Sequence, residues 1–180
     1  MPEKSAGGRW IFVYTRAEER VWGMPLFSRA MFFAVHWAAR KGLREDSAVA
    51  AGDRKEQARQ TGIRGETYAY WYLRRHGYVF VARNYQAPGV KGEIDLIGYD
   101  GAALVFVEVR TRTARAGQPG LPEMSVTREK RRHLVRTAQV FLAARRVPES
   151  PVRFDVLAIE NYPGRAPVVR LHKDAFPAHP

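Results

Sequence analysis

Three carboxylates and one guanidinium are the side chains of this sequence whose types and spacing could do chemistry together. They are Glu66, Asp95, Glu108 and Arg110. Asp95 and Glu108 each interrupt a run of aliphatic and aromatic residues, where burying a carboxylate is costly unless a cation or hydrogen bonds compensate. A hard divalent cation compensates well, because Mg²⁺ and Mn²⁺ take oxygen ligands, often from one or two carboxylates with water. The residue types therefore predict a Mg²⁺ or Mn²⁺ site.

A β-hairpin is expected to bring Asp95 and Glu108 together. Its parts are a strand over 93–99, the turn Asp100-Gly101 and a strand over 103–111. Counting outwards from the turn places Asp95 roughly opposite residues 106–108, within a metal ion's reach of Glu108. Because side chains alternate along a strand, Ile94 and Leu96 are both expected on the face opposite Asp95.

Glu66 supplies the third carboxylate, from a helix expected over 63–76. On that helix Glu66 shares a face with Ala69 and Leu73, and this face should point towards the sheet. Three acids from separate segments are thus predicted to converge on one cation. Taken singly, each could be a solvated side chain or part of a surface ion pair; their combination predicts the site.

The order of the expected elements is that of an α/β protein. After the first sixty residues it is helix, three strands, helix and two strands. The expected ranges are 63–76, 78–83, 93–99, 103–111, 127–146, 152–160 and 168–172. Gly77 follows the first helix as a C-terminal cap, and Thr127 can cap the start of the second.

The chain is predicted to divide into an N-terminal extension, residues 1–60, and a main domain, residues 61–180. Pro25 and Gly42 bracket an amphipathic helix over about 25–41. This helix could cover the core of the domain or lie on a membrane or a partner protein. Residues 44–61 are polar and small and are interpreted as a linker. Residues 10–14 (WIFVY) could form a short strand.

Charge and composition narrow the class of protein. The 180 residues include 30 Lys and Arg against 18 Asp and Glu, a net charge of +12, which attracts nucleic acid first and anionic lipid second. The absence of cysteine excludes a disulfide scaffold, a zinc finger and a thiol nucleophile. No apolar run approaches the roughly 20 residues that a membrane-spanning helix requires. We expect a cytoplasmic protein with no integral membrane segment.

Several basic side chains near the predicted site are candidates for contacts with nucleic-acid phosphates. They leave the third strand or cluster in the first half of the second helix: Arg112, Arg115, Lys130, Arg131, Arg132 and Arg136. Contacts of this kind position a nucleic acid without reading its bases, and they weaken steeply with salt. The alternative is that the helical members form an ordinary solvated face.

Short motifs at consistent spacing carry a resemblance to a known family. They are Gly65-Glu66, Gly77-Tyr78, Arg83-Asn84-Tyr85, GEIDLI (92–97), VFVEVRTR (105–112), Lys130-Arg131-Arg132 and RFDV (153–156). Over about residues 61–160 the chain resembles the bacterial UPF0102 (YraN) family. That family is similar in pattern to the PD-(D/E)XK nuclease superfamily and to the archaeal Holliday-junction resolvases.

The resemblance implies a restriction-endonuclease-like αβββαβ core, which is a mixed central sheet flanked by helices. The extension with its helix would precede this core. The resemblance also implies a Mg²⁺-dependent phosphodiesterase site, with Glu66 as the helix acid, Asp95 as the strand aspartate and Glu108 as the acid of an E-x-K element. Because resolvase-like sheets often work in pairs, a second copy of the chain is a candidate partner.

One position departs from this pattern, since the family usually has Lys where this chain has Arg110. In the nuclease mechanism that the resemblance implies, the Lys positions the attacking water and stabilises charge near the phosphate. Arg can supply charge and a bidentate phosphate clamp, but it cannot act as a base. Either the replacement is tolerated, or hydrolysis is lost and binding is kept, or Lys130 stands in.

Three functions follow from these readings. The first is a Mg²⁺-dependent nuclease acting on structured nucleic acid, with DNA as the expected substrate. The second is a non-catalytic nucleic-acid-binding module of the same fold, in which Arg110 clamps phosphate. The third is a peripheral membrane or adaptor protein that uses the helix at 25–41.

Overall fold

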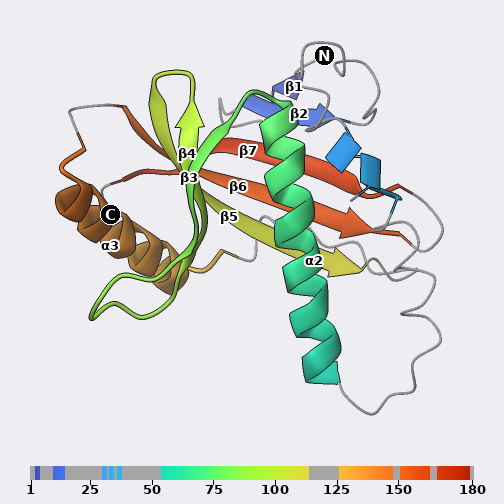
Figure 1. Ribbon diagram of the computed structural model, residues 1–180, viewed down its shortest axis with the longest axis horizontal. Coiled ribbons are helices and arrows are strands. Elements are labelled where there is room, and N and C mark those ends of the chain that lie inside the picture. The colour runs from blue at the N-terminus through green and yellow to red at the C-terminus, as the bar shows by residue number, and fades with distance from the viewer. Residues whose placement is uncertain are drawn as a thin grey trace.

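One mixed β-sheet with helices on both faces forms the core of the protein (Figure 1). The computed structural model describes residues 3–4, 10–14, 30–31, 33–34, 36–37, 54–113, 126–147, 151–162 and 166–178. The strand order is β1-β2-β7-β6-β5-β4-β3. The pair β5–β6 is parallel and the other neighbours are antiparallel. The predicted α/β class, with a mixed sheet flanked by helices, is therefore confirmed.

The bounds of the elements follow the expected order closely. They are β1 Glu3–Lys4, β2 Trp10–Tyr14, α2 Arg54–Arg75, β3 Val79–Tyr85, β4 Ile94–Asp100, β5 Ala103–Thr113, α3 Arg128–Arg145, β6 Val152–Asn161 and β7 Val168–Phe176. β7 is longer than predicted, since it continues to Phe176 and does not end at residue 172.

Two separate apolar clusters form the core, one on each face of the sheet. On one face, the buried side of α2 packs against odd-numbered residues of β5 such as Val105 and Val107. On the other face, the apolar stripe of α3 packs against even-numbered residues such as Leu104 and Phe106. Alternation along β5 therefore decides which helix each side chain faces. Figure 1 shows α2 crossing the sheet and α3 lying to one side.

The helix α2 begins at Arg54, inside the segment that was interpreted as a linker. The prediction of a linker over 44–61 is thus wrong for residues 54–61, and the rest of that segment lies outside the described residues. The physical reason is that Arg, Lys, Glu, Gln and Ala, which make this stretch polar, are also among the strongest helix formers.

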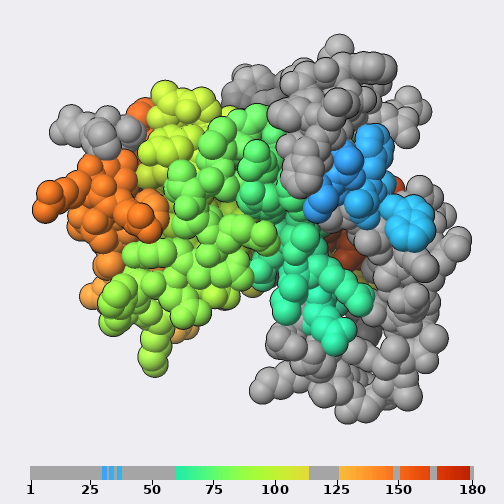
Figure 2. Space-filling model, in the orientation of Figure 1, coloured from blue at the N-terminus to red at the C-terminus, as the bar shows by residue number. Residues whose placement is uncertain are grey.

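The N-terminal residues that the structure describes lie against the main domain. β2 pairs with β7 in antiparallel register, which adds a strand from the predicted extension to the sheet. The described residues between 30 and 37 are helical, and they lie beside α2 (Figure 2). There His36 Nδ1 is 3.2 Å from the Tyr68 hydroxyl. This contact favours a helix that covers the domain; the remainder of 25–41 lies outside the described residues.

The β4–β5 hairpin separates at Asp95. Its register pairs Leu96 with Val107, and beyond this pair the Val109 N–H donates to the side chain of Asp95, at Oδ2, over 2.6 Å. From there β5 continues beside β6 alone. Ile94 and Leu96, expected on one face, belong to opposite core clusters, which indicates that β4 twists where it leaves β5.

Close contact between α2 and β5 depends on a glycine. A methyl group at Gly65 would overlap the Thr111 hydroxyl, so the helix can approach the strand only because this side chain is absent. Gly65 thereby sets how closely this turn of α2, and with it the next residue, Glu66, approaches the sheet.

We expect Gly65→Ala to lower the free energy of unfolding by about 1–3 kcal/mol, because the added methyl overpacks the α2–β5 contact. Gly62→Ala is the matched control on the same helix, since nothing lies within 4 Å of its added methyl. The control should raise the free energy of unfolding by about 0.5–1 kcal/mol through helix propensity. Urea unfolding of both variants provides the measurement, and equal effects would contradict the close packing.

Candidate metal and phosphate site

Asp95 of β4 and Glu108 of β5 form a buried pair of carboxylates. Only 7% of Asp95 and 3% of Glu108 is exposed. The last pair of the β4–β5 register is Leu96 with Val107, so Asp95 and Glu108 directly follow it on their strands, near where counting from the turn predicted them. Glu108 points to the face that carries α3, because Phe106 packs there and Lys130 of α3 contacts Glu108; Lys130 also lowers the pKa of Asp95.

Two cations flank Glu108. Lys130 Nζ, from the first turn of α3, lies 3.2 Å from Glu108 Oε2. Arg110 Nη2 lies 3.3 Å from Glu108 Oε1. The position of Lys130 is set locally, because Thr127 caps the helix by accepting a hydrogen bond from the Lys130 backbone N–H. Lys130 therefore approaches the sheet, which was one of the alternatives beside a solvated face of the helix.

The electrostatics of the pair favour a bound cation. Burial raises the pKa of Asp95, and the Glu108 carboxylate raises it further, while the Val109 N–H and Lys130 oppose the shift. Burial also raises the pKa of Glu108, against the opposing effects of Lys130 and Arg110. Two buried acids with raised pKa values resist ionising together, and a divalent cation relieves that cost by releasing their protons.

The donor set fits Mg²⁺ or Mn²⁺. Glu108 Oε2 is buried and lies 3.2 Å from the Lys130 ammonium. A carboxylate oxygen has two acceptor sites, so a single ammonium partner leaves capacity for a hard cation. Mg²⁺ is commonly held by one or two carboxylates together with water and substrate phosphate, so Asp95 and Glu108 suffice as protein ligands.

Glu66 lies apart from this pair. Its Oε2 accepts a hydrogen bond of 3.0 Å from Asn84 Nδ2, and Asn84 holds a left-handed backbone with φ of 49°. Glu66 is near enough to raise the pKa of Asp95. However, no three His, Cys, Asp or Glu side chains in the described part of the chain are grouped to hold a metal. The structure therefore brings together two of the three predicted carboxylates, because α2 packs on the opposite face.

The basic residues predicted to contact nucleic acid occupy different surroundings. Arg131 is tied to the fold, since its Nε donates to the Val126 carbonyl at 3.1 Å and its guanidinium lies 5.6 Å from the Phe176 ring centre. Arg132 and Arg136 are exposed and line a hollow of about 640 Å³ along α3.

Arg112 lies near the end of β5, and Arg115 follows this strand in the sequence. Arg112 is bound to the buried carboxylate of Glu160 through Nε and Nη2. Arg115 lies outside the described residues.

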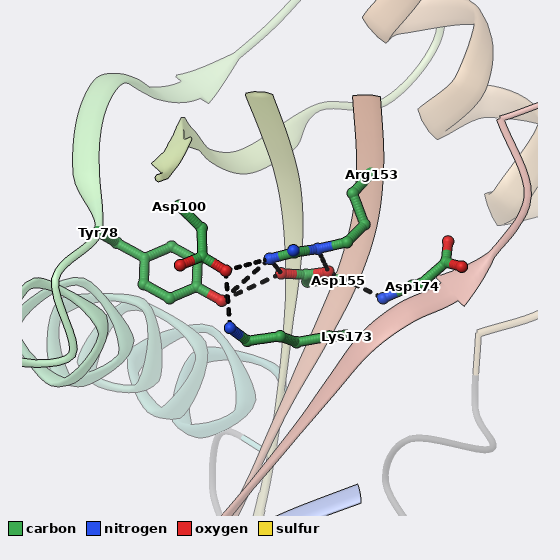
Figure 3. Close-up of polar contacts among 6 residues, drawn as sticks. All are labelled: Tyr78, Asp100, Arg153, Asp155, Lys173 and Asp174. Carbon is green, nitrogen blue, oxygen red and sulfur yellow. Dashed lines mark hydrogen bonds and ion pairs between the residues drawn. The ribbon is translucent and has the colours of Figure 1, made fainter. Parts of the chain in front are cut away.

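A second polar cluster surrounds the buried carboxylate of Asp155 and includes Tyr78 and Arg153 of the sequence motifs. It joins Tyr78, Asp100, Arg153, Asp155, Lys173 and Asp174 (Figure 3). The carboxylate of Asp155 is fully buried; it accepts from Arg153 Nε at 2.8 Å, from the Tyr78 hydroxyl at 3.2 Å and from the Asp174 N–H at 3.0 Å. Arg153 also donates to Asp100, as does Lys173.

This cluster differs from the candidate site because its charges are matched. Two acids face two bases, and the oxygens of Asp155 have hydrogen-bond donors from β6, from β7 and from the residue before β3. Burial and the neighbouring Asp155 raise the pKa of Tyr78, so its hydroxyl stays protonated and can donate. The cluster therefore fastens the hairpin turn to β6 and β7. An acid within an apolar strand was its sequence signal, and Asp95 shows the same signal.

The fold and the site define an α/β protein with a buried carboxylate pair flanked by Lys and Arg. A family model described as "Uncharacterised protein family UPF0102" matches residues 65–159, just over half of the chain. The chain belongs to this family, as its motifs predicted.

Bacterial members of the family resemble the chain over a similar length. A UPF0102 protein of Koribacter versatilis is 43% identical over 119 residues, which cover 65% of this chain and 79% of the relative. A UPF0102 protein of Symbiobacterium thermophilum is 42% identical over 121 residues, covering 67% and 99%. One from Ralstonia pickettii is 50% identical over 104 residues, covering 56% and 81%.

Among the described residues, none of the helices has the length and apolar character needed to cross a membrane.

We expect Asp95→Asn to make the metal-free protein more stable at pH 8 but not near pH 4. Folding raises the pKa of the Asp95 carboxyl. The protonated carboxyl therefore contributes its full stabilisation at pH values below its ordinary pKa of about 3.9. This contribution is lost as the pH rises through the raised pKa of the folded protein. Asn can still accept from Val109 but never ionises. As the pH rises, the difference in the free energy of unfolding between Asp95→Asn and wild type should widen by up to about 1.4 kcal/mol per pH unit.

Urea unfolding in EDTA at several pH values measures this gap. Glu129→Gln, which removes an exposed carboxylate from the first turn of α3, is the control and should show no comparable widening. A pH-independent difference between wild type and Asp95→Asn would contradict the prediction.

We expect Asp155→Ala to lower the free energy of unfolding by about 3–5 kcal/mol, because it leaves the Arg153 guanidinium without its buried partner. Tyr78→Phe removes one hydrogen bond to the same carboxylate and should cost about 0.5–1.5 kcal/mol. Thermal or urea unfolding measures both effects. If Tyr78→Phe bound divalent metal more weakly than wild type, a purely structural role for this cluster would be wrong.

Proposed function

We propose that this protein is a divalent-metal-dependent nuclease that hydrolyses phosphodiester bonds in structured nucleic acid, with DNA as the substrate. The observation that carries the proposal is the buried Asp95–Glu108 pair with the ammonium group of Lys130 3.2 Å from Glu108. An acid pair that favours a cation, placed beside side chains that attract phosphate, is suited to metal-assisted hydrolysis of phosphodiester bonds.

Asp95 and Glu108 would hold a Mg²⁺ or Mn²⁺ ion between β4 and β5. When bound, the ion supplies positive charge that polarises a phosphoryl oxygen and activates water. The separation of the two strands at Asp95 supports access to the pair, because β5 has no β4 partner beyond this point. In the hydrolysis, the oxygen of water bonds to phosphorus and gives up a proton, the bond to the leaving oxygen breaks, and the leaving oxygen takes up a proton.

Lys130 is the residue that we assign to the role of the Lys missing at position 110. Its ammonium has three donors, and one of them can face Glu108 while others face a phosphate or a water molecule. The capped first turn of α3 holds Lys130 on the same face of the sheet as the carboxylate pair. The charge therefore comes from a helix instead of from the strand.

Arg110 is suited to binding phosphate. Its side chain is 31% exposed, and Nη2 lies against Glu108 Oε1. A guanidinium can bind two phosphate oxygens at once and stabilise the negative charge that builds up in the transition state. The net charge of +12 supports a polyanionic substrate.

A second candidate function is nucleic-acid binding without hydrolysis. The observation that favours it is the contact between Arg110 and Glu108, because the guanidinium competes with a metal ion for that carboxylate. In this case the site would bind phosphate in EDTA and cleave nothing with any divalent cation.

We expect wild-type protein to bind Mg²⁺ or Mn²⁺ in calorimetric titrations and to nick plasmid or branched DNA. Asp95→Asn should weaken metal binding at least about tenfold, as expected when a coordination site loses a ligand charge. Lys130→Met should keep metal binding and lower cleavage by about 10²-fold, because charge near the reacting phosphate is lost. Arg145→Met, on the exposed last turn of the same helix, is the matched control and should cleave like wild type.

The outcomes separate the two candidates. Cleavage that persists in Asp95→Asn would come from a contaminant and would contradict the nuclease. Metal-independent DNA binding with no cleavage would support the binding module instead. Cleavage that appears only in Arg110→Lys would identify Arg110 as the block to hydrolysis.

A further inference from the structure

Charged side chains continue from the carboxylate pair along one face of β5. Glu108, Arg110 and Arg112 alternate with Val109 and Thr111, which face α2. Successive members of this row are two residues apart, about 6.6 Å along a strand. The row lies where β5 continues beside β6 after β4 has separated (Figure 1). The spacing of about 6.6 Å between successive members of the row is comparable with the separation of neighbouring phosphates along one nucleic-acid strand.

A buried carboxylate on the next strand holds Arg112 in place. Glu160 of β6, which is 4% exposed, lies beside Arg112 in the parallel register. Its Oε1 accepts from Arg112 Nε at 2.9 Å and from Nη2 at 2.5 Å. Its Oε2 lies 2.9 Å from Arg170 Nη2 and accepts from the Tyr162 hydroxyl at 3.2 Å.

This arrangement orients the Arg112 guanidinium and leaves part of it accessible for binding an anion. The Glu160 carboxylate is shared between two guanidinium groups, and Arg112 presents one edge to it while 30% of its side chain is exposed. Burial opposes ionisation of Glu160, but hydrogen bonds from Arg170 and Arg112 hold its pKa below the ordinary value. Glu160 therefore stays charged at neutral pH and fixes the guanidinium in one orientation. A guanidinium fixed in this way loses little entropy when it binds an anion.

We propose that Arg112, positioned by Glu160, is a phosphate subsite next to Arg110, so that the substrate strand runs along β5. Successive phosphates would then face the carboxylate pair, Arg110 and Arg112. The inference rests on the proposed function and narrows its substrate class. The ligand is a polynucleotide strand with at least two phosphates on one side of the bond at the carboxylate pair, rather than a mononucleotide or a small phosphodiester.

Binding of fluorescein-labelled single-stranded and branched DNA, followed by anisotropy in EDTA over a range of KCl concentrations, tests this proposal. For Arg112→Gln we expect weaker binding and a salt slope smaller by about 0.7–0.9, which corresponds to one lost phosphate contact. Arg145→Gln removes the same charge from the far end of α3 and should leave the slope unchanged. Equal losses in both variants would overturn the proposal, because net charge alone would explain them.

Glu160→Gln distinguishes positioning from general attraction by the direction of its effect. The substitution makes the protein more positive, so general attraction predicts tighter DNA binding. Loss of the fixed orientation of Arg112 predicts weaker binding instead. Tighter binding by a folded Glu160→Gln protein would overturn the proposal.

Arg112→Lys provides a test that does not require removing the buried acid. It keeps the charge but lacks the planar fork that Glu160 holds, so we expect weaker DNA binding than in wild type. Unchanged binding would overturn the proposal. Because all these measurements are made in EDTA, they do not depend on hydrolysis. Failure of metal binding or cleavage would count against the nuclease function and leave the phosphate subsite standing.

Discussion

The hydrogen bond from the Val109 N–H to the Asp95 carboxylate is the interaction on which the rest of the site depends. A backbone amide that would otherwise pair with β4 is satisfied by a side chain, so the ladder can end there without leaving a buried donor unpaired. The same bond holds a carboxylate inside the protein, opposite Glu108. One contact thus opens the sheet and concentrates negative charge at the opening.

The sheet contains a second interruption of the same kind with a different result. Where the β6–β7 register shifts, the Asp174 N–H donates to Asp155. There, Arg153 and Tyr78 also bind the carboxylate, and the charges are matched. The cations near Asp95 contact Glu108 instead. Two buried aspartates in similar backbone positions therefore differ in their partners, and this difference makes one a structural link and the other a candidate ligand.

The two helices divide the surfaces of β5 between them. α2 approaches the later part of the strand through Gly65 and Thr111, and α3 covers the earlier part on the other face. The polar row from Glu108 to Arg112 lies on the α3 face but beyond the apolar stripe of that helix. Lys130 at the start of α3 reaches the beginning of the row, and Glu160 supports its end. The packing of both helices therefore leaves a row of charged side chains, Glu108, Arg110 and Arg112, uncovered by apolar residues along β5.

The order of the elements, the hairpin register and the proximity of Asp95 and Glu108 could be predicted from the sequence. These depend on local rules, since a two-residue turn sets the register and alternation sets the face. Only the tertiary structure decided that Glu66 lies apart from the pair, that Lys130 reaches Glu108 and that β2 joins β7. It also decided which buried aspartate is neutralised and that Glu160 holds Arg112. Each of these depends on segments far apart in the chain, and residue spacing along one segment carries no information about which face of another it will meet.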